Sequence, residues 1–192
     1  MSDPTTAEIE VLPAREMSEA DLRGICELHH EAFFRAERSL AQRIEIARGR
    51  WLGDFPEGSH PRAHVVRDGD RIVAVAIALV RTLETEAGPM TVLGLSGVAT
   101  AATHRGQGLG QRVIGAAWRP VDERAYPLCL FQTGKARGLY ERLGARVVGN
   151  RFVDSTNTQD PQANPFTDEV AMIYPGDADW PDGMIDLRGP GY

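Results

Sequence analysis

The stretch THRGQGLGQRVI, residues 103–114, places three alternating glycines directly behind an arginine and directly before an apolar helical pattern. Glycine has no Cβ, so a backbone spaced in this way can approach a bound group closely. Backbone N–H groups that curl together at the start of a helix attract anions. The stretch therefore predicts an anion site, with Arg105 adding positive charge and a pyrophosphate as the expected guest.

Two common phosphate-binding motifs do not fit this stretch. A P-loop requires a Lys-Ser or Lys-Thr pair after its last glycine, and no such pair follows here. A dinucleotide fingerprint requires a third glycine five residues after the first, where this chain has Gln111 or Val113. Taken alone, the residues leave open a glycine-rich turn that binds nothing.

The composition is that of a water-soluble domain. The chain has 192 residues, 42% of them hydrophobic and 25% charged, which is enough for one domain with its own core. Its longest apolar run, residues 72–80, is far shorter than the roughly 20 residues of a membrane helix and reads as a buried strand. The acidic start lacks a signal-peptide pattern, so we expect a cytoplasmic protein without a membrane partner.

The charge of the chain is uneven. The net charge is −6, and residues 152–192 hold eight acidic residues against the single base Arg188. This balance argues against non-specific nucleic-acid binding. It is compatible with steering of a cationic substrate, and equally with simple solubility. Cys26 and Cys129 lie in no metal-ligand spacing, so we expect no metal and interpret both as small core residues.

Periodicity and turn signals predict a mixed α/β fold, with one central sheet in a single domain over 1–192. Ser18 is expected to cap the first helix, and Asp68-Gly69 to turn a hairpin. Gly94 and Gly97, in the strand before the glycine loop, suggest a bulge or a close backbone approach. A polar loop over 154–168 and an acidic arm over 175–192 complete the chain. The expected elements are strands at 9–14, 91–100, 128–133, 145–149 and 169–174, a hairpin at 63–84, and helices from 18 to about 34, over 37–52, from 109 to a stop at Pro120, and over 136–144.

Around the loop, the sequence resembles the GCN5-related N-acetyltransferase (GNAT) superfamily. Residues 105–110, RGQGLG, are similar to that family's acetyl-CoA loop, and Val98-Ala99-Thr100 before them to its splayed strand. Residues 136–145, ARGLYERLGA, are similar to a second signature of the family. The resemblance is close over 91–149. It implies a splayed, mostly antiparallel sheet flanked by helices, with acetyl-CoA as co-substrate.

The resemblance also implies residue roles. The backbone of Val98, Ala99 and Thr100 would hold the pantetheine arm, with an N–H near Val98 polarising the thioester carbonyl. Arg105 would shape the loop, and Tyr140 would protonate the leaving thiolate as general acid, although packing on the sheet is its alternative. The pyrophosphate would be held by the N–H groups of Gly106, Gln107, Gly108, Leu109, Gly110 and Gln111.

Some positions depart from the family pattern. Thr133 stands where Asn is frequent, Ala102 where Pro is frequent, and Ala145 where Phe is usual. The strand 91–100 carries no acid to serve as general base, although Ser96 is able to hold a water there.

The general base must therefore come from elsewhere. Glu31 is the first candidate, and Glu84 and Glu86 are the next, although a solvated surface acid is the ordinary interpretation of each. Histidine in general can exchange a proton near neutral pH, which makes residues 29, 30 and 104 further candidates, but we interpret the pair 29–30 as surface imidazoles. The aromatic residues 33, 34 and 51 suit a substrate pocket or core packing equally well.

We therefore expect an acetyl-CoA-dependent N-acetyltransferase that acts on a primary amine of a small molecule or a protein by direct attack in a ternary complex. The alternatives are a non-catalytic acyl-CoA-binding regulatory protein and a transferase for longer acyl chains. The residues leave the acceptor open, and also whether the arm 175–192 covers the active site or a second copy in a homodimer.

Overall fold

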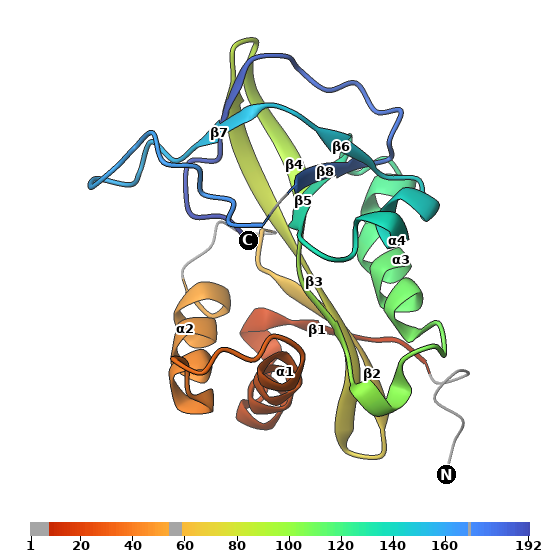
Figure 1. Ribbon diagram of the computed structural model, residues 1–192. Helices are drawn as coiled ribbons and strands as arrows, with labels where there is room; N and C mark the ends of the chain where they lie inside the picture. The colour runs from red at the N-terminus through yellow and green to blue at the C-terminus, as the bar shows by residue number, and fades with distance from the viewer. Residues whose placement is uncertain (1–7, 54–58, 169) are drawn as a thin grey trace. The chain divides into compact units, whose positions relative to one another are not determined.

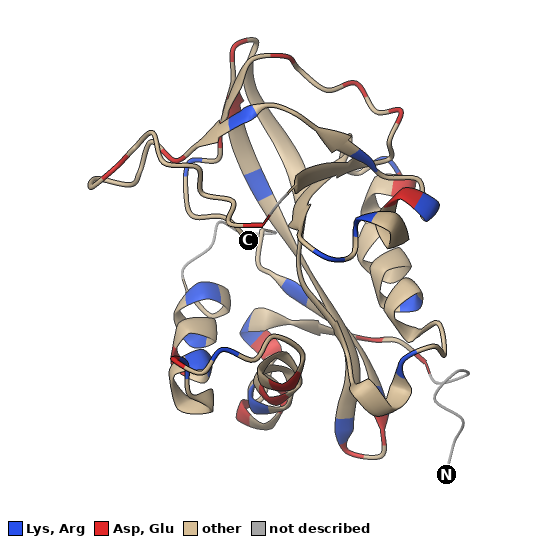
Figure 2. Ribbon diagram, viewed as in Figure 1, with Lys and Arg blue, Asp and Glu red and all other residues tan. Residues whose placement is uncertain are grey.

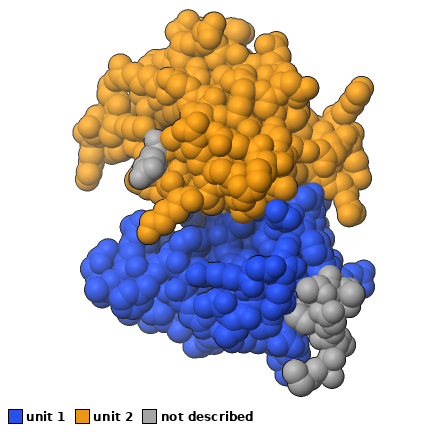
Figure 3. All heavy atoms as spheres, turned by 45° about the vertical axis from the view of Figure 1, so that its right-hand side comes forward, with its two compact units in different colours: residues 1–79, 97–117 blue, residues 80–96, 118–192 orange. Residues whose placement is uncertain are grey.

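The computed structural model describes residues 8–53, 59–168 and 170–192 (Figure 1). They fall into two compact units: residues 1–79 with 97–117, and residues 80–96 with 118–192 (Figure 3). Within the described ranges, nine strands form a mixed sheet with helices beside it, which confirms the predicted fold class. No helix in these ranges is long and apolar enough to cross a membrane.

The two N-terminal helices of unit 1 begin at matching caps. In α1 (Glu19–Ala32) the Ser18 hydroxyl accepts from the Asp21 N–H, and the Asp21 carboxylate accepts from the Ser18 N–H. Ser39 and Gln42 form the same capping box before α2 (Leu40–Trp51). Each box satisfies N–H groups that a helix start otherwise leaves unpaired. The cap at Ser18 is confirmed, and α2 begins three residues later than expected.

The strands of unit 1 form the predicted hairpin. β1 (Glu10–Pro13) is followed by the short helix η1 (Ala14–Glu16) and pairs antiparallel with β2 (Arg62–Asp68). β2 pairs antiparallel with β3 (Arg71–Thr85), and Gly69 turns between them with φ +58°. That positive φ explains the glycine, because other residues adopt it only with strain.

The glycine stretch 103–114 follows β4 (Gly88–Thr100): it begins inside the short helix η2 (Ala102–His104), passes through the loop 105–108 and ends inside α3 (Leu109–Asp122). The expected stop at Pro120 is wrong, because α3 continues for two more residues. A proline in the last turn loses only its own N–H bond, while its carbonyl still accepts from Ala125 at 2.8 Å.

Unit 2 contains the second half of the sheet. β5 (Cys129–Thr133) pairs parallel with β4 and antiparallel with β8 (Val170–Tyr174), which pairs antiparallel with β6 (Arg146–Val148). The β4–β5 register covers two pairs, Leu93 with Cys129 and Gly94 with Leu130. Both strands continue past these pairs, so they splay apart, as the family resemblance implies. α4 (Arg137–Arg142) ends before Gly144, which has φ +91°.

Two further strands of unit 2 were not predicted. β7 (Arg151–Val153) pairs parallel with β9 (Met184–Asp186), and β9 also pairs with β3 at Glu84. The arm expected to be irregular thus contains a strand. Its three residues are too few for a periodic signal and are surrounded by Gly, Pro and Asp, which mark loops in a sequence.

The end of the arm packs on its own unit. Arg81 donates to the carbonyls of Leu187 and Pro190, at 3.1 Å each, and the Gln132 side chain donates to the Tyr192 carbonyl at 2.9 Å. The Tyr192 ring lies against Phe166 from the polar loop. Acidic positions recur along the arm between β8 and β9 (Figure 2). The start of the last predicted strand, residue 169, lies outside the described residues.

Candidate functional site

The glycine loop of unit 1 is open and left-handed. Gly106 has φ +80° and Gly108 has φ +77°, conformations that other residues rarely adopt. A Cβ built on either glycine would meet nothing within 4 Å. Neither glycine is therefore needed to make room for a neighbouring group of the protein. Their positive φ angles shape a concave backbone segment with space beside it.

The N–H groups of this loop are available. Among the described residues, no backbone carbonyl accepts from the N–H groups of 106–111, and the first helical bond of α3 runs from Arg112 to the Gly108 carbonyl at 3.1 Å. The N-terminus of a helix also carries partial positive charge. The segment can therefore hold an anion through its backbone, which is what a pyrophosphate requires.

Neighbouring residues hold the loop in place. The Arg105 side chain donates from Nε to the Thr100 carbonyl at 3.4 Å, which ties the loop to the end of β4. His104 lies 3.4 Å from Asp68 of the β2–β3 turn. A Cβ on Gly110 would lie 3.3 Å from the Thr100 Oγ1, so this glycine permits close packing of helix on strand. Leu109 is buried and anchors the first turn of α3.

The close backbone approach that the sequence suggests for β4 is present at Gly97, which has φ +59° and no room for a Cβ beside the His29 ring. The Gly97 carbonyl oxygen lies 2.6 Å from the Nε2 atom of His29, on α1. The His29 ring is only 5% exposed and contacts the rings of Phe33 and Trp51. The interpretation of His29 as a surface imidazole is therefore wrong. The sequence does not show this burial, because both polar and apolar residues surround His29 along its helix and leave open whether the ring faces the core or the solvent.

In unit 2, Tyr140 lies on α4 and is 5% exposed. Its ring centroid is 4.6 Å from that of Phe131 and 6.2 Å from that of Trp118. Burial raises the pKa of the Tyr140 phenol above its usual range, with the nearby Cys129 and Asp168 acting in the same direction. The phenol is therefore protonated at neutral pH, as a general acid must be, and it also packs on its neighbours.

The two cysteines are buried and free. Burial raises the pKa of Cys26 to about 11, and burial also raises the pKa of Cys129. A nucleophilic cysteine needs the thiolate form, so neither residue is prepared for that role. The described residues contain no group of three His, Cys, Asp or Glu side chains that could hold a metal ion.

The candidate bases are engaged in ion pairs or backbone contacts. Both carboxylate oxygens of Glu31 accept from Arg71, at 2.9 and 3.0 Å. Glu84 accepts from Arg188 at 2.9 Å, and Glu86 is in contact with the Met184 N–H. Each carboxylate would have to leave its partner before it could take a proton from an amine.

The structure also places Thr133 and the three aromatic residues that the sequence suggested for a substrate pocket. The Thr133 hydroxyl accepts from the Ala136 N–H at 3.2 Å, so it holds the start of α4. Phe33 and Phe34 are 45% and 69% exposed at the end of α1, whereas Trp51 packs with the cluster between α1 and α2. The first two therefore remain available to a substrate, and Trp51 serves the core.

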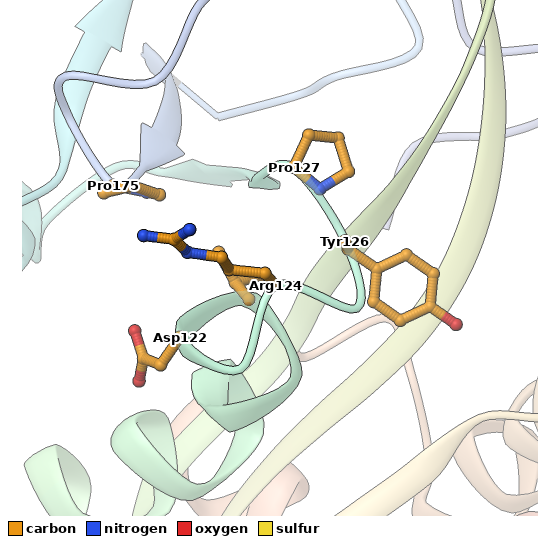
Figure 4. Close-up of a pocket in the computed structure, with 6 residues that line it drawn as sticks. Asp122, Arg124, Tyr126, Pro127 and Pro175 are labelled. Carbon is orange, nitrogen blue, oxygen red and sulfur yellow. The ribbon is translucent and has the colours of Figure 1, made fainter.

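A separate open cavity of about 440 Å³ lies at the C-terminal end of α3, in unit 2 (Figure 4). Asp122 at its wall accepts from the Tyr174 hydroxyl at 2.7 Å, and the Tyr174 ring stacks on Trp118 at 3.8 Å. Arg124 extends across the cavity toward Pro175. None of the residues that the sequence assigned to the site lines this cavity.

Comparisons with known proteins identify a family for this chain. A family model described as "Acetyltransferase (GNAT) domain" matches residues 13–148. No curated protein matches the sequence.

Three solved structures illustrate the shared fold. YhbS, a GNAT family N-acetyltransferase from Escherichia coli in complex with CoA, is 14% identical over 97% of this chain and 93% of its own, with a TM-score of 0.59. A transcriptional regulator from Bacillus halodurans C-125 is 23% identical over 71% and 92%, with a TM-score of 0.54. A GCN5-related N-acetyltransferase from Kribbella flavida is 18% identical over 77% of this chain, with a TM-score of 0.57, and this chain spans 35% of its length.

At these identities, likeness to the solved structures shows the fold alone. The family model carries more weight, because it covers well over half of the chain. The description of that family model supports acyl transfer in general terms. This chain belongs to the GNAT acetyltransferase family.

Proposed function

We propose that this protein moves an acetyl group from acetyl-CoA to a primary amine of a small molecule or a protein, by direct attack in a ternary complex. The observation that carries the proposal is the open glycine loop before α3. Gly106 and Gly108 turn the backbone without meeting any neighbour, and the N–H groups of 106–111 have no backbone acceptor among the described residues. A CoA pyrophosphate has the negative charge that such a segment attracts.

The splayed strand supports a place for the pantetheine arm. In unit 2, Leu95 and Ser96 continue β4 beyond the last residue that pairs with β5. We propose that Val98, Ala99 and Thr100 pair with the pantetheine amides as an added strand would. Main-chain hydrogen bonds of this kind bind without regard to side chains, so these positions need not be distinctive in a sequence.

The proposed chemistry uses few side chains. The amine nitrogen attacks the thioester carbonyl carbon, the C–S bond breaks, and the departing sulfur takes the proton of the Tyr140 hydroxyl. The Val98 N–H would stabilise the oxyanion that forms on the carbonyl. The raised pKa values of both cysteines support direct attack, because a covalent acyl-cysteine would need a thiolate.

The amine must lose a proton before it attacks. Glu31 could accept it after release from Arg71, or a water held by Ser96 could accept it. The excess of acids over 152–192 favours a cationic acceptor through long-range steering. Some of those acids are occupied locally: Asp154 accepts from Thr156, and Asp186 accepts from the Ser155 N–H.

Calorimetric titration of the full chain with acetyl-CoA tests the binding step, and thiol release across a panel of amines tests transfer. We expect binding of acetyl-CoA and turnover with at least one amine. Absence of any acyl-CoA binding would overturn the proposal. Competition with longer acyl-CoAs would show whether acetyl is the preferred group.

The variant Tyr140→Phe tests the general acid. It removes the proton and keeps the ring that packs on Phe131, so we expect kcat to fall by about a hundredfold while the Kd of acetyl-CoA stays unchanged. Tyr126→Phe is the matched control, since Tyr126 lines the separate cavity. Equal kcat in the two variants would remove Tyr140 from the mechanism.

A non-catalytic acyl-CoA-binding regulatory protein is the second candidate. The acid-free strand β4 and the occupied Glu31 favour it, and one protein with this fold is described as a transcriptional regulator. Tight acetyl-CoA binding without transfer to any amine of a broad panel would decide for it.

A further inference from the structure

The hydrogen bond between His29 and Gly97 of β4 has a defined direction. The Gly97 carbonyl can only accept a hydrogen bond, so the His29 Nε2 atom, 2.6 Å away, must carry the proton. The imidazole is therefore a donor at Nε2, and in its neutral form Nδ1 carries no proton.

The two residues are fitted to each other. A Cβ on Gly97 would lie 3.4 Å from Ile77 and 2.7 Å from the Cε1 atom of His29. The second distance is shorter than Cβ atoms show in real structures. The ring cannot easily retreat, because it is buried and lies against Phe33 and Trp51. The positive φ of Gly97 and the position of the histidine ring thus depend on each other, and both residues lie within unit 1.

A planar trans peptide links this contact to the next residue. The carbonyl of Gly97 and the N–H of Val98 belong to the same peptide plane and point in opposite directions. A donor that fixes the carbonyl therefore also fixes the direction of the N–H. Within the proposed function, on which this inference rests, that N–H stabilises the oxyanion.

We infer that His29 is a positioning residue, whose Nε2–H holds the Gly97–Val98 peptide so that the Val98 N–H points away from α1 and toward the acyl carbonyl. Preorganised donors stabilise a developing charge without reorganising during the reaction. His29 acts through the backbone and does not itself touch the acetyl group.

The protonation state of His29 is consistent with this role. Burial, assisted by the nearby Arg43 and opposed by the Gly97 contact, lowers the pKa of His29 to about 4. The ring is therefore neutral throughout the pH range in which an acetyltransferase is assayed. A constant donor suits positioning, whereas a general base would change its protonation during turnover.

A pair of variants separates the donor from the space that the ring fills. His29→Gln retains an N–H donor at a similar reach, and His29→Met has a similar length and no donor. With saturating acetyl-CoA and the best amine of the panel, we expect kcat of the Met variant to fall 10- to 100-fold. We expect the Gln variant to recover to within about fivefold of wild type, and the Kd of acetyl-CoA to change little in both.

Several outcomes would overturn the inference. Equal kcat in the Gln and Met variants would show that the donor is irrelevant. Loss of the acidic limb of the kcat/KM profile in the Gln variant would show that His29 is the general base. If the wild-type protein is active and the Met variant has the same kcat, the role of His29 is refuted and the proposed function stands. If the wild-type protein binds no acyl-CoA, both the proposed function and the role of His29 are refuted.

A measurement on the wild-type protein does not depend on the folding of any variant. We expect nitrogen-15 spectra to show His29 as the neutral Nε2–H tautomer from pH 5 to 8. The Val98 amide proton should shift downfield with acetyl-CoA and much less with CoA, which lacks the acyl carbonyl. The Nδ1–H tautomer, or equal shifts with the two ligands, would contradict the inference.

Discussion

Gly97 and the loop glycines Gly106 and Gly108 share a positive φ but differ in their surroundings. The space beside Gly97 is filled by His29, whereas nothing lies within 4 Å of a Cβ built on either loop glycine. The first glycine is explained by the protein's own side chain. The other two have open space beside them, as Gly69 does in its turn, but they also lie beside N–H groups that have no backbone acceptor among the described residues. We therefore propose a ligand at the loop and a fixed backbone at Gly97.

Gly97→Ala should give the largest effect on stability. The added Cβ meets the buried imidazole and forces a left-handed alanine, which together should lower the free energy of unfolding by about 3 kcal/mol. Urea unfolding measures this. In a His29→Ala background the same change should cost only about 1 kcal/mol, the strain of the backbone alone. Equal costs in the two backgrounds would show that the two residues do not press on each other.

The buried His29 should make the stability of the folded chain sensitive to acid. The pKa of His29 is about 4 in the folded chain, against 6.5 for a free imidazole. Between pH 4 and pH 6.5 the unfolded state therefore binds a proton at His29 that the folded state does not bind. The contribution of the neutral His29 to the free energy of unfolding is fully present above about pH 6.5 and is lost as the pH falls toward 4. At pH 5 the loss should be about 2 kcal/mol. Thermal unfolding against pH should show a shallower decline in His29→Gln than in wild type; identical declines would mean that His29 is not responsible.

Gly106→Ala and Gly108→Ala should have the smallest effect on stability and a clear effect on binding. Each adds only backbone strain, about 1 kcal/mol, because no neighbour is met. The strained residue should turn its N–H groups away from the anion and raise the Kd of acetyl-CoA at least about tenfold.

Gly69→Ala is the matched control for the loop. Gly69 has φ +58° and equally open surroundings, but it lies in the β2–β3 turn. It should lose similar stability and keep the wild-type Kd. If Gly69→Ala weakened binding as much as Gly108→Ala does, the effect would be one of stability, and the loop would lose its assignment.

Local patterns were enough to predict much of the fold. Helix caps such as Ser18, the turn at Asp68-Gly69 and the strand–loop–helix order around Arg105 depend on residues close in sequence, and the structure confirms them. The strands β7 and β9 were missed, because each is three residues long and is stabilised by its partner rather than by its own composition.

The sequence by itself determined the family and the loop, because glycine spacing and a helix start act over a few neighbouring residues. Only the tertiary structure decided the role of His29, the ion pair that occupies Glu31 and the packing of the arm on its own unit. His29 and Gly97 are 68 residues apart. Contacts at that separation depend on how whole elements pack, and no local propensity records them.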